Sequence, residues 1–156
     1  MDWMSALAVT AWISGDVEGR GGMTPERMVE LLGTLGGEVE EDGNVVEFAY
    51  ESVPMALIYD TIADRMRIVS PIVEVDMMEE GQLEAAMEAN YHSALDARYA
   101  TANDIVWAAF IHPLSDLSDE LFLSAVRQVA VARVTFGQEY TSGELIFGGG
   151  DEEPQA

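Results

Sequence analysis

EFAYESVPMALIYDTIADRMRIVSPI, residues 47–72, is the stretch that decides the fold class. It contains short runs rich in aromatic and β-branched residues, which predict strands ending near Tyr50, over 55–60 and over 65–70. Turn residues separate the runs, and Pro71 is expected to limit the third strand. Because the connections are short, neighbouring strands must pair antiparallel.

Helical patterns flank this meander on both sides. Thr24 is a good N-cap and Pro25 suits the first helical position, which predicts a helix over 24–36. Further elements follow the meander: a helix over about 79–96, strands near 97–101 and over 105–112, and a helix over 119–136. The order α-β-β-β-α-β-β-α predicts an α+β fold, an antiparallel sheet of about five strands with three helices.

Three segments are expected along the 156 residues. Residues 1–22 combine an apolar arm with a glycine-containing linker, 23–147 form one domain, and 148–156 are a disordered acidic tail. The apolar run Met4–Ile13 has about the length of a signal-peptide core but lacks a positively charged start. We therefore expect a cytoplasmic protein; export directed by the first 20 or so residues is the alternative.

The charge of the chain is strongly negative. Twenty-nine Asp and Glu residues oppose seven Arg and no Lys, for a formal net charge of −22. A surface of this kind argues against binding to nucleic acid or to an anionic membrane. It suits a basic partner or a salty environment, and it is also explained by solubility alone. With no cysteine, disulfides, thiol catalysis and cysteine-ligated metals are excluded.

Two predicted strands, 55–59 and 105–112, are apolar on both faces. A sheet with one face in water alternates apolar with polar residues, so both faces of these strands must be covered. The helices could cover both faces, or one face could be left for the N-terminal arm, a second subunit or a partner chain. The candidate partner-binding residues on and beside these strands are Tyr50, Leu57, Tyr59, Trp107 and Phe110.

The stretch EANYHSALDARYA, residues 88–100, places Glu88, His92 and Asp96 four residues apart. On a helix these side chains would share one face and could hold a metal or transfer protons. However, the apolar stripe through Met87 and Tyr91 would turn them about 100° away, towards the helix edge or solvent. A structural helix is therefore the preferred interpretation; a metal-dependent or hydrolytic enzyme using these three residues is the alternative. The sequence carries no nucleophile elbow or phosphate loop, and it predicts no cofactor.

The element order and patterns over about residues 23–137 resemble the type III secretion chaperone-like fold, including its Tir-chaperone and YbjN-type branches. The resemblance is carried by MTPERMVELLGTLGG, by the meander, by LEAAMEANYHSAL and by ARYATANDIVWAAFIHPL. It implies a non-enzymatic module that binds a protein partner, or itself as a homodimer, through an apolar sheet face. The export alternative would keep this fold in an envelope domain of unknown role.

Overall fold

The computed structural model describes residues 22–143, so most of the arm, 1–21, and the tail, 148–156, lie outside the described residues. The helices and strands have these bounds: α1 Pro25–Gly33, β1 Val39–Asp42, β2 Val45–Tyr50, β3 Val53–Asp60, β4 Arg65–Glu74, the 3-10 helix η2 Val75–Met77, α2 Gln82–His92, β5 Arg98–Ala102, β6 Ile105–His112 and α3 Asp119–Thr135. The predicted α+β class is confirmed.

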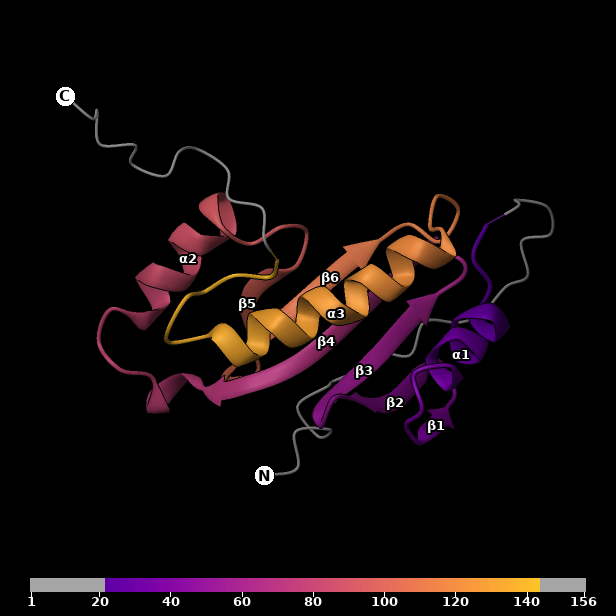
Figure 1. Cartoon of the computed structure of the whole chain (residues 1–156), viewed down its shortest axis with the longest axis horizontal. Coiled ribbons are helices and arrows are strands. Elements are labelled where there is room, and N and C mark those ends of the chain that lie inside the picture. Colours follow the sequence, from indigo (N-terminus) through magenta and orange to yellow (C-terminus); the bar gives the residue numbers. More distant parts are fainter. Residues whose placement is uncertain (1–21, 144–156) are drawn as a thin grey trace.

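All strand pairs are antiparallel, and the sheet order is β1-β2-β3-β4-β6-β5. The sheet has six strands rather than about five, because Val39–Asp42 pairs with β2 as a full strand. A tight turn at Gly43, whose φ is +63°, makes this pairing possible. The short acidic strand β1 therefore forms one edge of the sheet, and β5 forms the other (Figure 1).

The prediction that Pro71 limits the third strand is wrong. Strand β4 continues to Glu74, and its register against β6 shifts between Pro71 and Val73. This irregularity accommodates a residue that has no N–H to donate. The carbonyl oxygen of Pro71 instead accepts a hydrogen bond from Arg133 Nε of α3, at 2.7 Å.

The main hydrophobic core lies between one face of the sheet and the helices. Helix α3 crosses that face over β4 and β6, and α1 packs beside it (Figure 1). The core joins strand residues to residues of all three helices, among them Met28, Leu32, Val46, Phe48, Met55, Leu57, Met66, Ile68, Ala86, Phe110, Phe122, Val126 and Val129. Ser118 caps α3 as predicted, accepting from Leu121 N at 3.1 Å.

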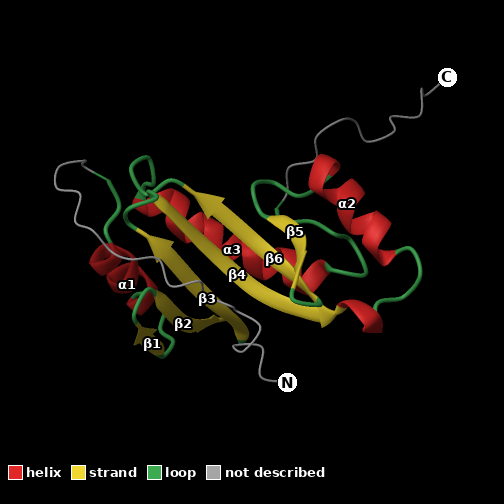
Figure 2. Cartoon of the chain, turned by 180° about the vertical axis from the view of Figure 1, so that it is seen from behind, coloured by secondary structure: helices red, strands yellow, loops and turns green. Residues whose placement is uncertain are grey.

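A second, smaller hydrophobic cluster lies on the opposite face of the sheet. It consists of the buried residues Val45, Ala56, Val69, Ile105 and Trp107, and we call it the second cluster. Every member comes from a strand, whereas all three helices contribute to the main core. Figure 2 shows the sheet from this side, with α3 behind it. The described helices therefore cover one face of the sheet and not the other.

Two helices are shorter than predicted. Helix α1 ends at Gly33 rather than near residue 36. Helix α2 begins at Gln82, because Gly81 has a φ of +85° that interrupts any earlier helical turn, and it ends at His92 rather than at Asp96. No helix in the described part of the chain is long and apolar enough to span a membrane.

Candidate functional site

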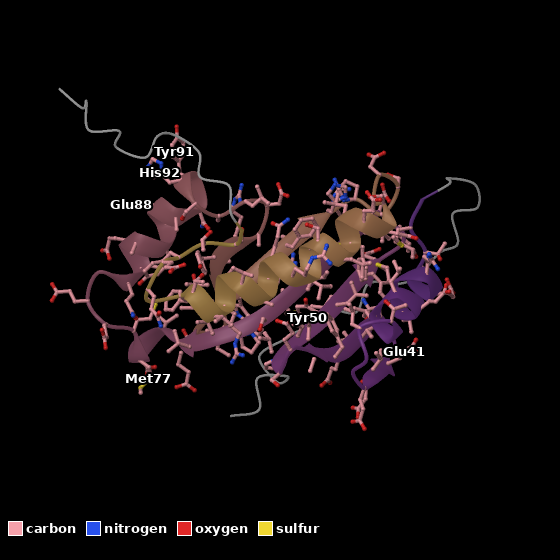
Figure 3. The ribbon with its side chains drawn as sticks, viewed as in Figure 1. Glu41, Tyr50, Met77, Glu88, Tyr91 and His92 are labelled. Carbon is pink, nitrogen blue, oxygen red and sulfur yellow. The ribbon has the colours of Figure 1, made fainter. Side chains whose placement is uncertain are left out.

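Because α2 ends at His92, Asp96 is separated from Glu88 and His92, its partners in the alternative metal site. Glu88 and His92 are exposed on the last turns of the helix, and Figure 3 shows both beside Tyr91, pointing away from the sheet. Asp96 lies beyond the helix, where Gln128 Nε2 of α3 donates to its Oδ2 at 3.2 Å. Within residues 22–143, no three His, Asp or Glu side chains are grouped closely enough to hold a metal ion.

The five predicted partner-binding residues lie on opposite faces of the sheet. Leu57 and Phe110 are buried in the main core, beneath the helices. Trp107 belongs to the second cluster on the other face, and its indole Nε1 donates to Ala102 O at 3.0 Å. The structure therefore does not gather these residues into one surface, and their role in binding stays a prediction.

Tyr50 and Tyr59 are half-buried at the margin of the main core. The hydroxyl of Tyr59 donates to Gly43 O at 3.1 Å, which ties the end of β3 to the turn after β1. Burial raises the pKa of this phenol, and the carboxylates of Glu41 and Glu26 raise it further because they disfavour a second negative charge. Tyr59 is therefore neutral at physiological pH and acts as a hydrogen-bond donor.

The most exposed group of apolar side chains on a single helix lies on α2. Leu83, Met87 and Tyr91 are spaced four residues apart, and their exposed fractions are 44%, 63% and 77%. We call these three residues the α2 stripe. Met77 of η2, just before this helix, is also 69% exposed. Apolar residues at this spacing share one helix face, and that face is turned to solvent here.

The opposite side of α2 explains why the stripe points outward. Ala86 and Ala89 are buried against the body of the protein. Asn90 binds the β5 backbone at both of its amide atoms: Nδ2 donates to Tyr99 O at 3.0 Å, and Oδ1 accepts from Tyr99 N at 2.8 Å. This pair of hydrogen bonds fixes the rotation of the helix, so its larger apolar residues cannot turn inward.

Negative charge surrounds the α2 stripe. Glu79 and Glu80 precede the helix, and Glu84 and Glu88 lie on it; all four are exposed. Their side chains belong to a chain with a net charge of −22. A surface that combines apolar contact area with carboxylates suits a partner with apolar and basic residues side by side.

The sequence contained the signal for this surface but did not indicate its direction. The sequence predicts that the stripe through Met87 and Tyr91 lies on the packed side of the helix, and this prediction is wrong. In the structure the packed side carries the small residues Ala86 and Ala89, and the large residues are exposed. Periodicity identifies an apolar face, but it does not tell whether that face packs within the chain.

Comparisons with known proteins identify the fold. No protein-family model matches the chain, and no curated protein is significantly similar to it in sequence. A chain in the crystal structure of the ExsC–ExsE complex is similar in structure, with a TM-score of 0.53 and 15% identity over 68% of this chain and 84% of that chain. A chain in the HopA1–SchA chaperone–effector complex has a TM-score of 0.53 and 11% identity, over 69% of this chain and 87% of that chain.

These similarities confirm the prediction of a type III secretion chaperone-like fold. At such low identity the likeness concerns the fold and does not assign binding residues. The resemblance to the Tir-chaperone and YbjN-type branches of this fold stays a prediction.

Proposed function

We propose that the protein is a non-enzymatic binding module that holds a segment of a partner polypeptide. The proposal is supported by the fold it shares with chains from two protein complexes, one of them named as a chaperone–effector complex. The observation that carries it is the α2 stripe, three large apolar residues that are exposed to solvent. They lie on α2, at one end of the molecule (Figure 1). Exposed apolar residues grouped in this way are typical of protein-binding surfaces.

The expected occupant of the α2 stripe is a segment with alternating or helically spaced apolar residues and neighbouring Arg or Lys. Apolar side chains would cover Met87 and Tyr91, while basic side chains would pair with Glu84 and Glu88. A second copy of the chain is less suited to this surface at low salt, because it would bring another 22 net negative charges. The resemblance to secretion chaperones predicts binding through a sheet face, whereas the exposed apolar residues favour α2.

A direct test uses two fluorescent synthetic peptides, one built from Leu and Arg and one in which each Arg is replaced by Glu. We expect the Leu/Arg peptide to bind with an affinity that falls as salt is raised, and the Leu/Glu peptide not to bind. The double variant Met87→Gln/Tyr91→Gln should lower the affinity for the Leu/Arg peptide by at least about tenfold, which corresponds to about 1.4 kcal/mol of binding free energy. Fluorescence anisotropy measures both effects.

The matched control is Val134→Gln. Val134 is 64% exposed and also lies on a helix, but it is on α3, outside the α2 stripe. It should leave peptide binding unchanged. Equal weakening by both variants, or none by either, would contradict the proposal. A stable dimer of the parent protein that dissociates in the double variant would show instead that a second copy occupies the stripe.

A further inference from the structure

The second cluster is more deeply buried than an open sheet face should be. Trp107 is 4% exposed, Val69 and Ile105 are each 4% exposed, and Ala56 is fully buried. Tryptophan is a large residue that is rarely buried to this degree without a covering layer. Since all three helices belong to the main core on the other face, something else must cover this one.

The chain itself offers one segment suited to the task. Residues 4–13, MSALAVTAWI, form an uninterrupted stretch of ten residues without a charged side chain. Small residues lie between Leu7, Val9 and the adjacent pair Trp12 and Ile13, which suits a flat face that contains Ala56 and Ala109. The chain carries 36 charged residues in total. An uncharged stretch of this length therefore has few other surfaces on this protein against which it can be buried from water.

The connection to this segment begins at the end of β6, next to the loop that follows the strand. Met23 N donates to Leu114 O at 2.9 Å, just after the end of β6. Gly22 lies so close to the next residue of that loop that a Cβ atom would come 2.7 Å from Ser115 Cα. These contacts fix the start of the described chain at the end of the strand that carries Trp107.

The linker is long enough for the segment to reach the cluster. Residues 14–22, SGDVEGRGG, are nine residues that can span up to about 30 Å when extended. Trp107 lies five residues before His112, the last residue of β6, which corresponds to about 17 Å along the strand. The glycines of the linker also allow the chain to reverse direction.

The residues beyond the C-terminal end of the described chain are less suited to cover the second cluster. Gly143 packs against Leu95, in the loop that follows α2. The residues beyond it contain a short apolar run, Leu145–Phe147, which is followed by glycines and acidic residues. Such a run cannot cover a cluster that extends over four strands, from β2 to β6.

We propose that the apolar segment Met4–Ile13 of the same chain covers the second cluster and closes this face of the sheet. The inference is independent of the proposed function, which concerns the α2 stripe. It predicts that the second face is closed by the chain's own residues rather than by a partner or a second copy.

Quenching of Trp107 fluorescence by acrylamide tests the inference in the full chain. In a Trp3→Phe/Trp12→Phe background, Trp107 is the remaining tryptophan. We expect it to be shielded there and to become several-fold more accessible when Val9→Asp places a charge in the covering segment. The control Val17→Asp makes the same change in the linker and should leave Trp107 shielded. Ready quenching in the background protein, or equal shielding in both Asp variants, would overturn the proposal.

Cross-linking then tests which chain does the covering. Because the protein has no cysteine, Ala8→Cys can be paired with Ala109→Cys on the second face or, as a control, with Val134→Cys on α3. A flexible bis-maleimide should cross-link positions 8 and 109 within one molecule. The yield of the cross-link between positions 8 and 134 should be much lower. Equal yields for the two pairs, or cross-linked dimers as the main product for 8 and 109, would overturn the proposal; dimers would assign the face to a second copy.

Discussion

The side-chain amide of Gln128 holds the backbone at Asp96. Gln128 lies in α3 and is 4% exposed, yet its Oε1 accepts hydrogen bonds from Asp96 N at 2.9 Å and from Ala97 N at 3.1 Å. Its Nε2 donates to Asp96 Oδ2 and to Ser124 Oγ, each at 3.2 Å. One buried side chain thus fastens the loop that joins α2 to β5.

Replacing this side chain should be costly. Gln128→Ala leaves two backbone N–H groups without their acceptor, and we expect a loss of about 2–4 kcal/mol in the free energy of unfolding. Urea denaturation measures the loss. The control is Gln138→Ala at an exposed position just after α3, which should change stability by less than about 0.5 kcal/mol. Similar values for the two variants would contradict the role given to Gln128.

Phe122 and Tyr91 should respond very differently to truncation. Phe122 of α3 is fully buried in the main core, so Phe122→Ala should cost about 3–5 kcal/mol. Tyr91 of the α2 stripe is 77% exposed, so Tyr91→Ala should cost less than about 1 kcal/mol. Thermal and urea unfolding of both variants measure the difference. A large loss of stability in Tyr91→Ala would show that the stripe is structural rather than available to a partner.

The ion pair between α1 and α3 should make stability depend on pH. Arg27 Nη2 lies 2.5 Å from Asp119 Oδ2, and Arg27 Nε also donates a hydrogen bond to that carboxylate. The hydrogen bond from Arg27 lowers the pKa of Asp119 in the folded protein. The contribution of this ion pair to folding stability is therefore fully present above the pKa of Asp119 in the unfolded chain, about 4. It is lost as the pH falls through the lower pKa of Asp119 in the folded protein.

The variant Asp119→Asn isolates this contribution. The parent should be more stable than the variant at neutral pH, and the difference in urea midpoint should shrink as the pH falls below about 4 and vanish below the lower pKa of the folded state. Glu120→Gln is the control, because it removes the same charge from the same first turn of α3 at an exposed position. A difference for Glu120→Gln that matches that for Asp119→Asn would assign the effect to the helix dipole rather than to Arg27.

A glycine in the loop of the hairpin between β2 and β3 should stabilise the protein. Its two loop residues, Glu51 and Ser52, have φ values of +48° and +68°, which are unfavourable for residues with a Cβ atom. Ser52→Gly should therefore stabilise the protein by about 0.5–1 kcal/mol. The same change at the neighbouring exposed position Ala49, which lies within β2, should destabilise it by a similar amount. Thermal unfolding should show a higher melting temperature for Ser52→Gly and a lower one for Ala49→Gly than for the parent.

Zinc should not stabilise the protein through His92. Because α2 ends at His92, Asp96 does not lie on the helix face that carries Glu88. We expect any shift in melting temperature with added zinc to be the same in the parent and in His92→Ala. A large stabilisation that the variant loses would contradict this expectation and restore the metal-dependent alternative.

Much of the fold could be predicted because the decisive signals are local. Strand β6 runs from Ile105 to His112 as expected, since an apolar run ends at Pro113. Helix α3 begins at Asp119, after the capping residue Ser118. The turn residues Asp42, Gly43 and Asn44 indicate a hairpin or a lead-in to one before β2. The acidic residues ahead of that turn carry no apolar alternation, so β1 is missing from the expected five strands; its pairing with β2 makes it a strand.

The candidate site could be predicted much less well. Whether Leu57 and Phe110 are buried depends on which sheet face α3 covers, and that is decided by long-range packing rather than by alternation in the strands. The outward direction of Met87 depends on two hydrogen bonds between Asn90 and Tyr99, nine residues apart. No pattern within α2 contains that information.

The acidic edge strand β1 has a consequence for the behaviour of the protein in concentrated solution. A strand at the edge of a sheet presents unpaired backbone groups, and a neighbouring molecule could extend the sheet there. In β1, Glu40, Glu41 and Asp42 are all exposed, so two such edges would repel each other before their backbones could pair. The acidic strand β1 therefore opposes aggregation of the protein through this edge of the sheet.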